Sequence, residues 1–303
     1  MDVDALAALA AVRSQGGVTK AAAVLHVSPS AVSQRLAALT RAAGTPLTER
    51  DGRRLRLTPA GHALADAALD VAASLERART AARDVLARPS GVVRVSAFSS
   101  GAELLLPGLL TRLARFPDVV VECSDEDVAL EDFAALTDRL DVVIAHRPET
   151  QPAWTAHPRQ VRTRTLLREP LDVAVPTTHP LAARESLTPD DLLDEPWIAV
   201  REGFPVAAVL HAVAGQHAPA RIVHRVNDFH VVLSLVAAGH GLSLLPRHTC
   251  GHHPDVRLLP LTGVRAGRLV DALVRPDKAE RPLVRLVLDE LGDLAREVAP
   301  DEH

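Results

Sequence analysis

The chain has few cysteines, few aromatic residues and almost no lysine. Its 303 residues include two cysteines, five phenylalanines, two tryptophans and no tyrosine. Cys123 and Cys250 lie far apart, so the sequence predicts neither a disulfide framework nor a CxxC site, and a reducing compartment fits. Two lysines stand against 32 arginines in an alanine-rich background, which indicates a compositional bias of the genome rather than chemistry.

Long hydrophobic segments are also missing. No run of about 18 apolar residues is present, and the N-terminal segment MDVDALAALA lacks the basic flank of a signal peptide. We therefore expect a cytoplasmic protein that does not partner a membrane. With 303 residues, 47% hydrophobic and 24% charged, the chain is long enough to form more than one domain around a sizeable core.

Positive charge is concentrated at the N-terminus. Residues 1–60 carry eight basic and four acidic side chains, a net charge of +4, whereas the whole chain carries −4 and the remainder therefore −8. A basic module on an acidic body predicts that only the N-terminus meets a polyanion.

The first 43 residues have the pattern of three short helices. The first helix ends at a glycine pair, and we expect Thr19 to cap a second helix over residues 20–25. A third helix begins in the segment VSPSAVSQRL. There Ser28 is the expected N-cap, and Pro29 takes the first helical position, where its missing N–H costs nothing.

The third helix has two different faces. At about 100° per residue, Val32, Leu36 and Leu39 fall together and face inward, while short polar side chains fall on the opposite side. The second helix of a tightly joined pair can enter the major groove and read base edges. Solvated residues on a small helical bundle would give the same periodicity, so this alternative stays open here. The predicted DNA-contacting residues of this helix are Ser28, Ser30, Ser33 and Gln34.

A basic hairpin follows. The segment TERDGRRLRLTPAG has a turn at Asp51-Gly52 between two short extended stretches, with Arg53, Arg54 and Arg56 clustered at its tip. Such a wing would place cations beside DNA phosphates or in a minor groove.

Residues 58–88 are expected to form one long helix. Apolar residues recur with spacings of 4, 3, 4, 3, 4 and 3 over three heptads, which predicts a helix that needs a partner helix. The seam residues are Leu64, Ala68, Val71, Leu75, Ala78, Ala82 and Val85. A core helix of the C-terminal domain is the alternative, but Arg88-Pro89-Ser90-Gly91 breaks the chain directly afterwards, which favours dimerisation.

From Gly91 onward, strands alternate with helices. This pattern predicts α/β sheets, and its two units suggest two lobes around a cleft. The expected strands are 92–98, 119–123, 141–145, 171–175, 221–226 and 242–246. The expected helices are 101–115, 129–139, 188–194, 205–215 and 228–238.

Several segments carry a family resemblance. AAAVLHVSPSAVSQRLAAL followed by PLTERDGRRLRLTPAG resembles the winged helix-turn-helix domain of the LysR-type transcriptional regulators. LTPDDLLDEPWIAV, THPLAAR and LVAAGHGLSLLP resemble the effector-binding domain of the same regulators. Leu9 and Thr48 stand where that family usually has phenylalanine, and both are expected core positions.

The resemblance implies an α/β protein with an N-terminal all-α winged helix-turn-helix, a linker helix and a two-lobed effector domain of the periplasmic-binding-protein type. The implied boundaries are 1–61 for DNA binding, 58–88 for the linker helix that pairs subunits, and 91–303 for the effector domain. Crossovers near 161–166 and 262–268 divide the effector domain into lobe I, 91–161 with 268–303, and lobe II, 166–262. The resemblance also implies a homodimer or homotetramer on double-stranded operator DNA.

A small-molecule effector is expected between the lobes. Ser99 and Ser100 lie where a strand meets a helix, and hydroxyls and free backbone N–H groups there suit an anion, although simple N-capping explains them equally well. The other candidates lie at strand ends or in loops: Ser124, Asp125, His146, Arg147, Arg201, Glu202, Phe204, Asn227 and Asp228. Their mixed charges fit a zwitterion as well as an acid.

The segment HTCGHHP suggests a metal only weakly. His248, Cys250 and either His252 or His253 offer donor atoms, but the spacing matches no defined zinc motif, so we predict neither a metal nor a cofactor.

Enzyme motifs such as GxSxG, HExxH, GxGxxG and the P-loop are missing, and no spacing selects an acid/base pair. The favoured function is a ligand-responsive transcriptional regulator. The alternatives are an enzyme with a fused DNA-binding head and an architectural DNA-binding protein. The latter would have little use for an acidic domain of about 210 residues.

Overall fold

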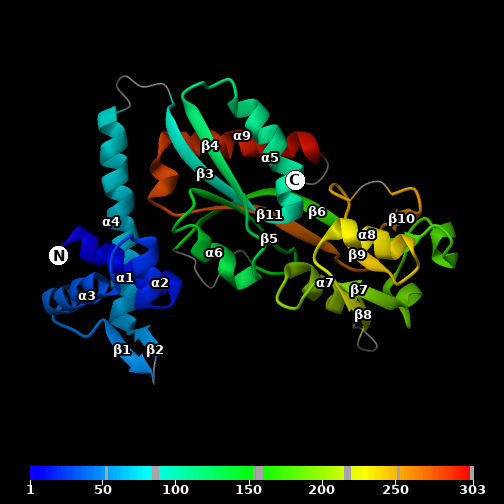
Figure 1. The fold of residues 1–303 in the computed structure, drawn as a ribbon, viewed down its shortest axis with the longest axis horizontal. Coiled ribbons are helices and arrows are strands. Elements are labelled where there is room, and N and C mark those ends of the chain that lie inside the picture. The colour runs from blue at the N-terminus through cyan, green and yellow to red at the C-terminus, as the bar shows by residue number, and fades with distance from the viewer. Residues whose placement is uncertain are drawn as a thin grey trace.

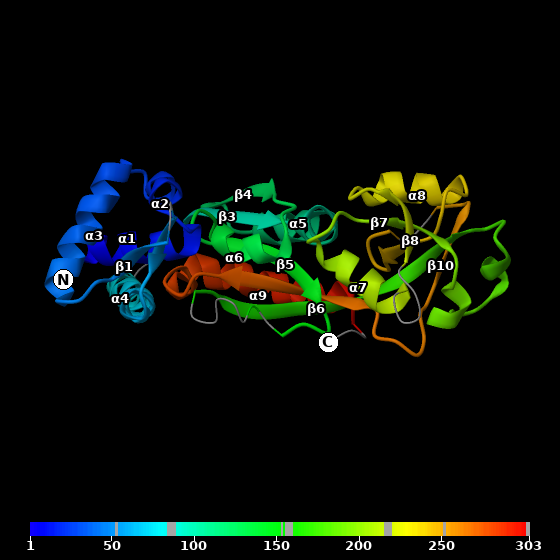
Figure 2. The same cartoon turned by 90° about the horizontal axis from the view of Figure 1, so that it is seen from below.

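The computed structural model describes residues 1–51, 54–83, 89–152, 154, 160–214, 220–250 and 253–300. An N-terminal helical unit, a long helix and two α/β lobes make up the molecule (Figure 1). Seen from below, the N-terminal unit, the first lobe and the second lobe follow one another along the longest axis (Figure 2). None of the described helices is both long and apolar enough to cross a membrane.

The N-terminal unit packs three helices and a hairpin around one small core. Its elements are α1 (Val3–Gln15), α2 (Val18–Val24), α3 (Pro29–Ala43), β1 (Thr48–Asp51) and β2 (Arg54–Leu57). The inward residues predicted for the third helix, Val32, Leu36 and Leu39, are all buried in this core. Leu9 is also fully buried, whereas Thr48 is half-buried at the start of β1.

Helix ends follow the local sequence in two of three cases. Ser28 Oγ accepts a hydrogen bond from Ala31 N at 3.2 Å, as expected of an N-cap. Gly16 ends α1 with a φ of 70°, a left-handed conformation that glycine adopts without strain. The expectation for Thr19 was wrong. The second helix begins at Val18, so the Thr19 hydroxyl lies inside the first turn instead of before it.

The long helix α4 (Pro59–Arg83) continues directly from the hairpin, and residues 84–88 of the predicted helix lie outside the described residues. Thr58 Oγ1 accepts a hydrogen bond from Gly61 N at 3.0 Å and caps the helix as expected. A Cβ at Gly61 would lie 2.0 Å from Leu47 O, so only glycine permits this close approach. Farther along, the seam residues Val71 and Leu75 are each 38% exposed.

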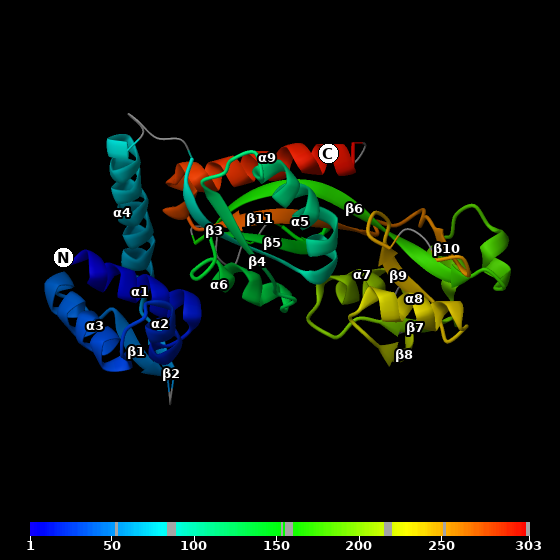
Figure 3. The ribbon, with the colours of Figure 1, turned by 45° about the horizontal axis from the view of Figure 1, so that its top comes forward.

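Lobe I contains one end of the main sheet. Its strands are β3 (Gly91–Ala97), β4 (Val119–Asp125), β5 (Val142–Pro148) and β11 (Gly267–Val274). Its helices are α5 (Ser99–Leu113), η1 (Leu130–Asp132), α6 (Phe133–Leu136), η4 (Lys278–Glu280) and α9 (Pro282–Val298). The strand β3 is parallel to β4 and β5, while β11 is antiparallel to β5. Figure 3 shows α5 and α9 lying together along the sheet, where they contact each other.

Lobe II contains the other end of the main sheet and a separate parallel pair of strands. Its strands are β9 (Ser243–Pro246), β10 (Val256–Leu259), β7 (Pro196–Ala199) and β8 (Arg221–Arg225). Its helices are η2 (Pro180–Ala183), η3 (Pro189–Leu192), α7 (Pro205–Ala214) and α8 (Phe229–Ala237). The helix expected over 188–194 is therefore a short 3-10 turn, and the helix expected over 129–139 is divided between η1 and α6.

A single strand, β6 (Arg162–Pro176), joins the two lobes. Up to Pro170 it pairs with β11 of lobe I, and from Leu171 it pairs with β9 and β10 of lobe II. The first crossover thus lies at about residue 170, later than the expected 161–166. Because proline has no N–H to donate, Pro170 fits the point where the strand changes partners, and the chain crosses without a loop.

Candidate functional site

The third helix presents a polar face to solvent. Ser30, Ser33 and Gln34 are exposed, on the side opposite the buried apolar residues. The Ser28 and Ser30 hydroxyl oxygens lie 2.9 Å apart, and Ser33 Oγ donates to Pro29 O at 3.0 Å. The hydroxyl oxygens keep acceptor capacity, and the exposed Gln34 amide offers both donors and an acceptor, the combination that can pair with adenine. This face has the chemistry to read base edges.

The hairpin β1–β2 projects from the same unit, beside the first turns of α4 (Figure 1). Arg50 and Arg56 are exposed on its two strands. Arg53 and the side chain of Arg54 lie outside the described residues. Exposed cations on a projecting hairpin are suited to phosphate contacts, which set affinity rather than sequence preference.

A cavity of about 340 Å³ lies between the two lobes. Five of the predicted effector residues line it: Ser99, Ser100, Phe204, Asn227 and Asp228. His146, also expected near the cleft, lines it as well. The first two residues come from the start of α5 in lobe I and the other three from loops that precede helices in lobe II, so the cavity spans both lobes.

Five predicted residues do not line this cavity. Ser124, Asp125 and Arg201 are absent from its wall, and Arg147 and Glu202 line a second interlobe cavity of about 470 Å³ instead. Arg147 Nε donates to the buried Asp271 Oδ2 at 2.7 Å, so its charge is already paired. The sequence shows that a residue lies at a strand end but not which way its side chain faces. For this reason all eleven residues were expected in one cleft.

The sequence did not indicate Arg268, the central cation of the interlobe cavity. Its guanidinium donates to Glu169 Oε2 at 2.7 Å and to Ser100 Oγ at 2.9 Å, and it lies 4.8 Å from the centre of the Phe98 ring. The Arg268 side chain is 1% exposed and that of Glu169 is 0% exposed. Arg268 is the second residue of β11, and no sequence motif surrounds it.

His146 forms an uncharged wall of the cavity. The side chain is buried, and its ring centroid lies 4.1 Å from that of Phe98 and 5.8 Å from that of Phe133, with the Phe133 and His146 rings in an edge-on arrangement. Burial, assisted by the nearby positive charge of Arg268, holds the pKa of His146 well below its usual value. Its Nδ1 atom has no hydrogen-bond partner among the described residues. A buried polar atom without a partner is the kind of group that a ligand can satisfy.

Acidic side chains face the cavity from both lobes. Asp127 lies beyond β4, where Asn227 Nδ2 of lobe II donates to its Oδ2 at 3.4 Å. Burial raises the pKa of Asp127 above its usual value, although Arg201 and Arg268 act in the opposite direction. Glu103 of α5 faces His230 of α8 at 3.5 Å. These two interlobe contacts lie where a bound molecule would also lie.

The histidine and cysteine segment has no metal-binding geometry in the described residues. No group of three His, Cys, Asp or Glu side chains within them could hold a metal ion. Cys250 is buried, and burial raises its pKa to about 12, which disfavours a thiolate ligand. His252 lies outside the described residues.

Comparison with known proteins agrees with this architecture. Residues 3–62 match the model of the bacterial regulatory helix-turn-helix protein, lysR family, and residues 86–296 match that of the LysR substrate binding domain. The chain belongs to the LysR family. Because the second match alone covers most of the chain, the predicted family and fold class are confirmed.

Three relatives illustrate the match. The transcriptional regulator TtuA of Agrobacterium vitis is 30% identical over 258 residues, covering 82% of this chain and 81% of TtuA. The regulator IlvR of Caulobacter vibrioides is 30% identical over 281 residues, covering 89% and 88%. The structure of a full-length OxyR variant from Pseudomonas aeruginosa has a TM-score of 0.64 and 23% identity, covering 98% of each chain. The LysR-family protein described here is therefore a ligand-responsive DNA-binding regulator, and the enzyme alternative is not supported.

Proposed function

We propose that the exposed face of α3 reads operator bases while the β1–β2 hairpin contacts phosphates. The assignment of Ser28, Ser30, Ser33 and Gln34 to bases and of Arg56 to the backbone rests on exposure and side-chain chemistry. The assignment of Arg53 and Arg54 to the backbone rests on their charge and their place in the hairpin sequence. Base contacts would set sequence preference, and arginine contacts would set affinity and its salt dependence. On this proposal the protein works in the cytoplasm, where its operator DNA lies.

The effector of this regulator binds in the interlobe cavity. The observation that carries this assignment is that the lining comes from both lobes: Ser99 and Ser100 from one, Phe204, Asn227 and Asp228 from the other. A ligand that contacts both walls favours one relative position of the lobes, and it changes DNA binding only if it binds one assembly state better than another.

Two chains pair through α4. The exposed Val71 and Leu75 lie on the heptad seam, away from the core of the N-terminal unit. Pairing there would set two recognition helices at a fixed separation, and further contacts between effector domains would give a homotetramer. The functional units are then residues 1–61 for DNA binding, 58–88 for pairing and 91–303 for the effector. Within the last unit, the chain passes from one lobe to the other at about residues 170 and 266.

The test starts from the full-length protein and sheared genomic DNA of its source organism. We expect it to retain a fragment from a promoter beside its own gene and to give a defined footprint, which small molecules extracted from the cells should alter. Retention without sequence preference would contradict specific regulation. A footprint that no extract changes would contradict control by an effector.

A further inference from the structure

Carboxylates outnumber cations in the wall of the interlobe cavity. Glu103, Asp127 and Asp228 line it, whereas Arg268 is the one arginine among its described lining residues. The charge of Arg268 is already matched by Glu169 at 2.7 Å, buried behind the wall. The surplus in the cavity is therefore negative, which favours a ligand that carries a positive group.

Asp127 is the carboxylate best placed to receive that group. Asp228 uses Oδ1 to accept the backbone N–H groups of His230 and Val231, at 2.8 and 3.2 Å, and Glu103 faces His230. Asp127 is half-buried, and among the described residues its one hydrogen-bond donor is Asn227, at 3.4 Å. An ammonium group beside Asp127 would add to the positive charges of Arg201 and Arg268 nearby, and it would donate the short hydrogen bonds that the described residues do not give this carboxylate.

The other end of the cavity suits an anion. The N-cap position of α5 is occupied by Phe98, whose side chain cannot cap, so the first N–H groups of this 15-residue helix are left for another acceptor. The exposed Ser99 adds a hydroxyl at the same place. A second observation points to a ligand here, because the buried His146 in the same wall has an unpartnered Nδ1.

We propose that the effector is a small zwitterion of amino-acid type, with its ammonium group held by Asp127 and its carboxylate at the start of α5. The inference rests on the proposed function, namely that this cavity is the effector site. A volume of about 340 Å³ accommodates a molecule of this size. The imidazole of His146, which burial keeps uncharged, adds no positive charge near the ammonium group.

Thermal unfolding of the full-length protein tests the ligand class. The probes are the twenty common amino acids and short ω-amino acids at about 5 mM, each beside the matched carboxylic acid without the amine and the matched amine without the carboxylate. We expect at least one zwitterion to raise Tm while both of its matched partners leave Tm unchanged. Stabilisation by carboxylic acids or neutral molecules alone, or by no zwitterion, would overturn the proposal.

Variants locate the bound zwitterion. Asp127→Asn should raise its Kd at least about tenfold, whereas Asp125→Asn, two residues away and outside the cavity, should leave Kd unchanged. If Asp127→Asn fails to fold, Asp127→Glu and Asp127→Gln replace it, and Glu should bind more tightly than Gln. Equal Kd values for wild type and the uncharged variant would overturn the role of Asp127.

Gel shifts on the operator separate this inference from the proposed function. A carboxylic acid that stabilises the protein and alters operator affinity would refute the zwitterion and leave the effector cavity in place. A zwitterion that binds through Asp127 without changing operator affinity would support the ligand class and contradict its action as an effector.

Discussion

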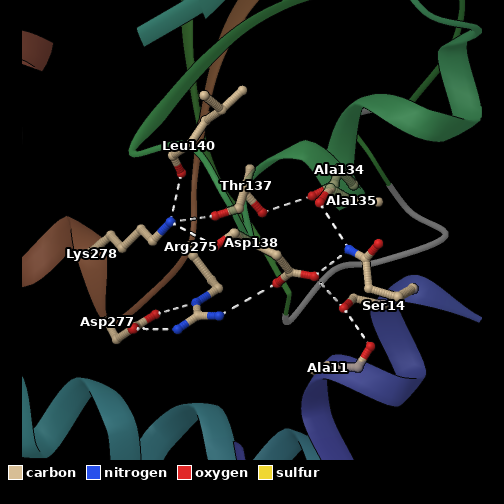
Figure 4. A network of polar contacts seen from close by, with 11 residues as sticks. Ala11, Ser14, Ala134, Ala135, Thr137, Asp138, Leu140, Arg275, Asp277 and Lys278 are labelled. Atoms are coloured by element: carbon tan, nitrogen blue, oxygen red, sulfur yellow. Dashed lines mark hydrogen bonds and ion pairs between the residues drawn. The ribbon is translucent and has the colours of Figure 1, made fainter. Parts of the chain in front are cut away.

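Gln15, the last residue of the first helix, donates from Nε2 to Asp138 Oδ2 of lobe I at 2.6 Å. Figure 4 shows Asp138 between its partners Ser14 and Arg275. Ser14 Oγ donates to the same oxygen, and Gln15 also donates to Ala135 O at 3.2 Å. Asp138 Oδ1 accepts from Arg275, which Asp277 holds through two hydrogen bonds of 2.7 Å. The DNA-binding unit thus contacts the effector domain of its own chain at the Asp138 carboxylate and at the nearby carbonyl of Ala135.

One short helix, α6, connects this contact with the wall of the effector cavity. The α6 residue Phe133 contacts the ring of His146 in the cavity wall, and the turn after α6 carries Asp138. Lys278 Nζ donates to three carbonyl oxygens of that turn, those of Thr137, Asp138 and Leu140, at 2.8, 3.0 and 2.7 Å. A change in the cavity wall therefore has a packed route to the first helix of the DNA-binding unit.

Gln15→Ala should loosen the attachment without unfolding either part. The variant removes two hydrogen bonds between the units, and amide hydrogen exchange should quicken at the end of α1 and around residues 134–138. Gln34→Ala, on another helix of the same unit, is the matched control and should leave this exchange unchanged. If Gln15→Ala exchanges like wild type, the contact with Asp138 does not hold the units together.

If α3 reads bases and the hairpin contacts phosphates, substitutions on the two surfaces should have different effects on DNA binding. Gln34→Ala should change the relative affinities of single-base operator variants by about 1–3 kcal/mol at one position. Arg56→Ala should weaken all sequences alike and reduce the salt dependence. Gel shifts at several salt concentrations measure both effects, and unchanged relative affinities for Gln34→Ala would show that another face of α3 reads the DNA.

If the exposed apolar seam of α4 pairs two subunits, acidic substitutions in that seam should separate them. Val71→Asp combined with Leu75→Asp places two carboxylates in an apolar interface, at a cost of several kcal/mol unless they become neutral. Sedimentation should show smaller species and gel shifts weaker operator binding. Ala81→Asp, on another exposed face of the helix, should sediment like wild type. An unchanged oligomer in the double variant would place the interface elsewhere.

Because His146 is buried without a charge, we expect the protein to lose stability in mild acid. Its pKa in the folded protein lies well below the ordinary value of 6.5, because burial disfavours the imidazolium. As the pH falls below 6.5, the unfolded chain binds a proton at this residue and the folded chain does not, so the free energy of unfolding falls. Between about pH 7.5 and 5.5 the loss should be about 1 kcal/mol greater in wild type than in His146→Gln, measured by urea unfolding. An equal loss in both proteins would mean that His146 titrates normally.

The N-terminal unit could be predicted well from local sequence patterns. The spacing of Val32, Leu36 and Leu39 and the cap at Ser28 depend on neighbours within one or two helical turns, which a sequence displays directly. The misplaced cap at Thr19 shows the limit of this reasoning, since a residue suited to capping does not by itself fix where a helix begins.

The effector cavity was only partly predictable, because it depends on contacts between distant segments. Ser99 and Ser100 could be named since a strand meets a helix there, and they do line the cavity. Arg147 was expected beside them, but the register of β5 with β11 places it near Asp271. The role of Arg268 could not be predicted from its neighbours in the chain, because its partners Ser100 and Glu169 are 168 and 99 residues away in sequence.

The most direct test of the account is an operator titration with the identified effector, comparing wild type with Ser99→Ala. Ser99 is the cleaner site, because Ser100→Ala would also remove a partner of Arg268. Without effector the two proteins should bind the operator equally. With effector, wild-type affinity should change by about 1–3 kcal/mol, and Ser99→Ala should need about fivefold more effector for the same change, equivalent to about 1 kcal/mol. Identical effector dependence in both proteins, with the effector still bound, would contradict a ligand site at the start of α5.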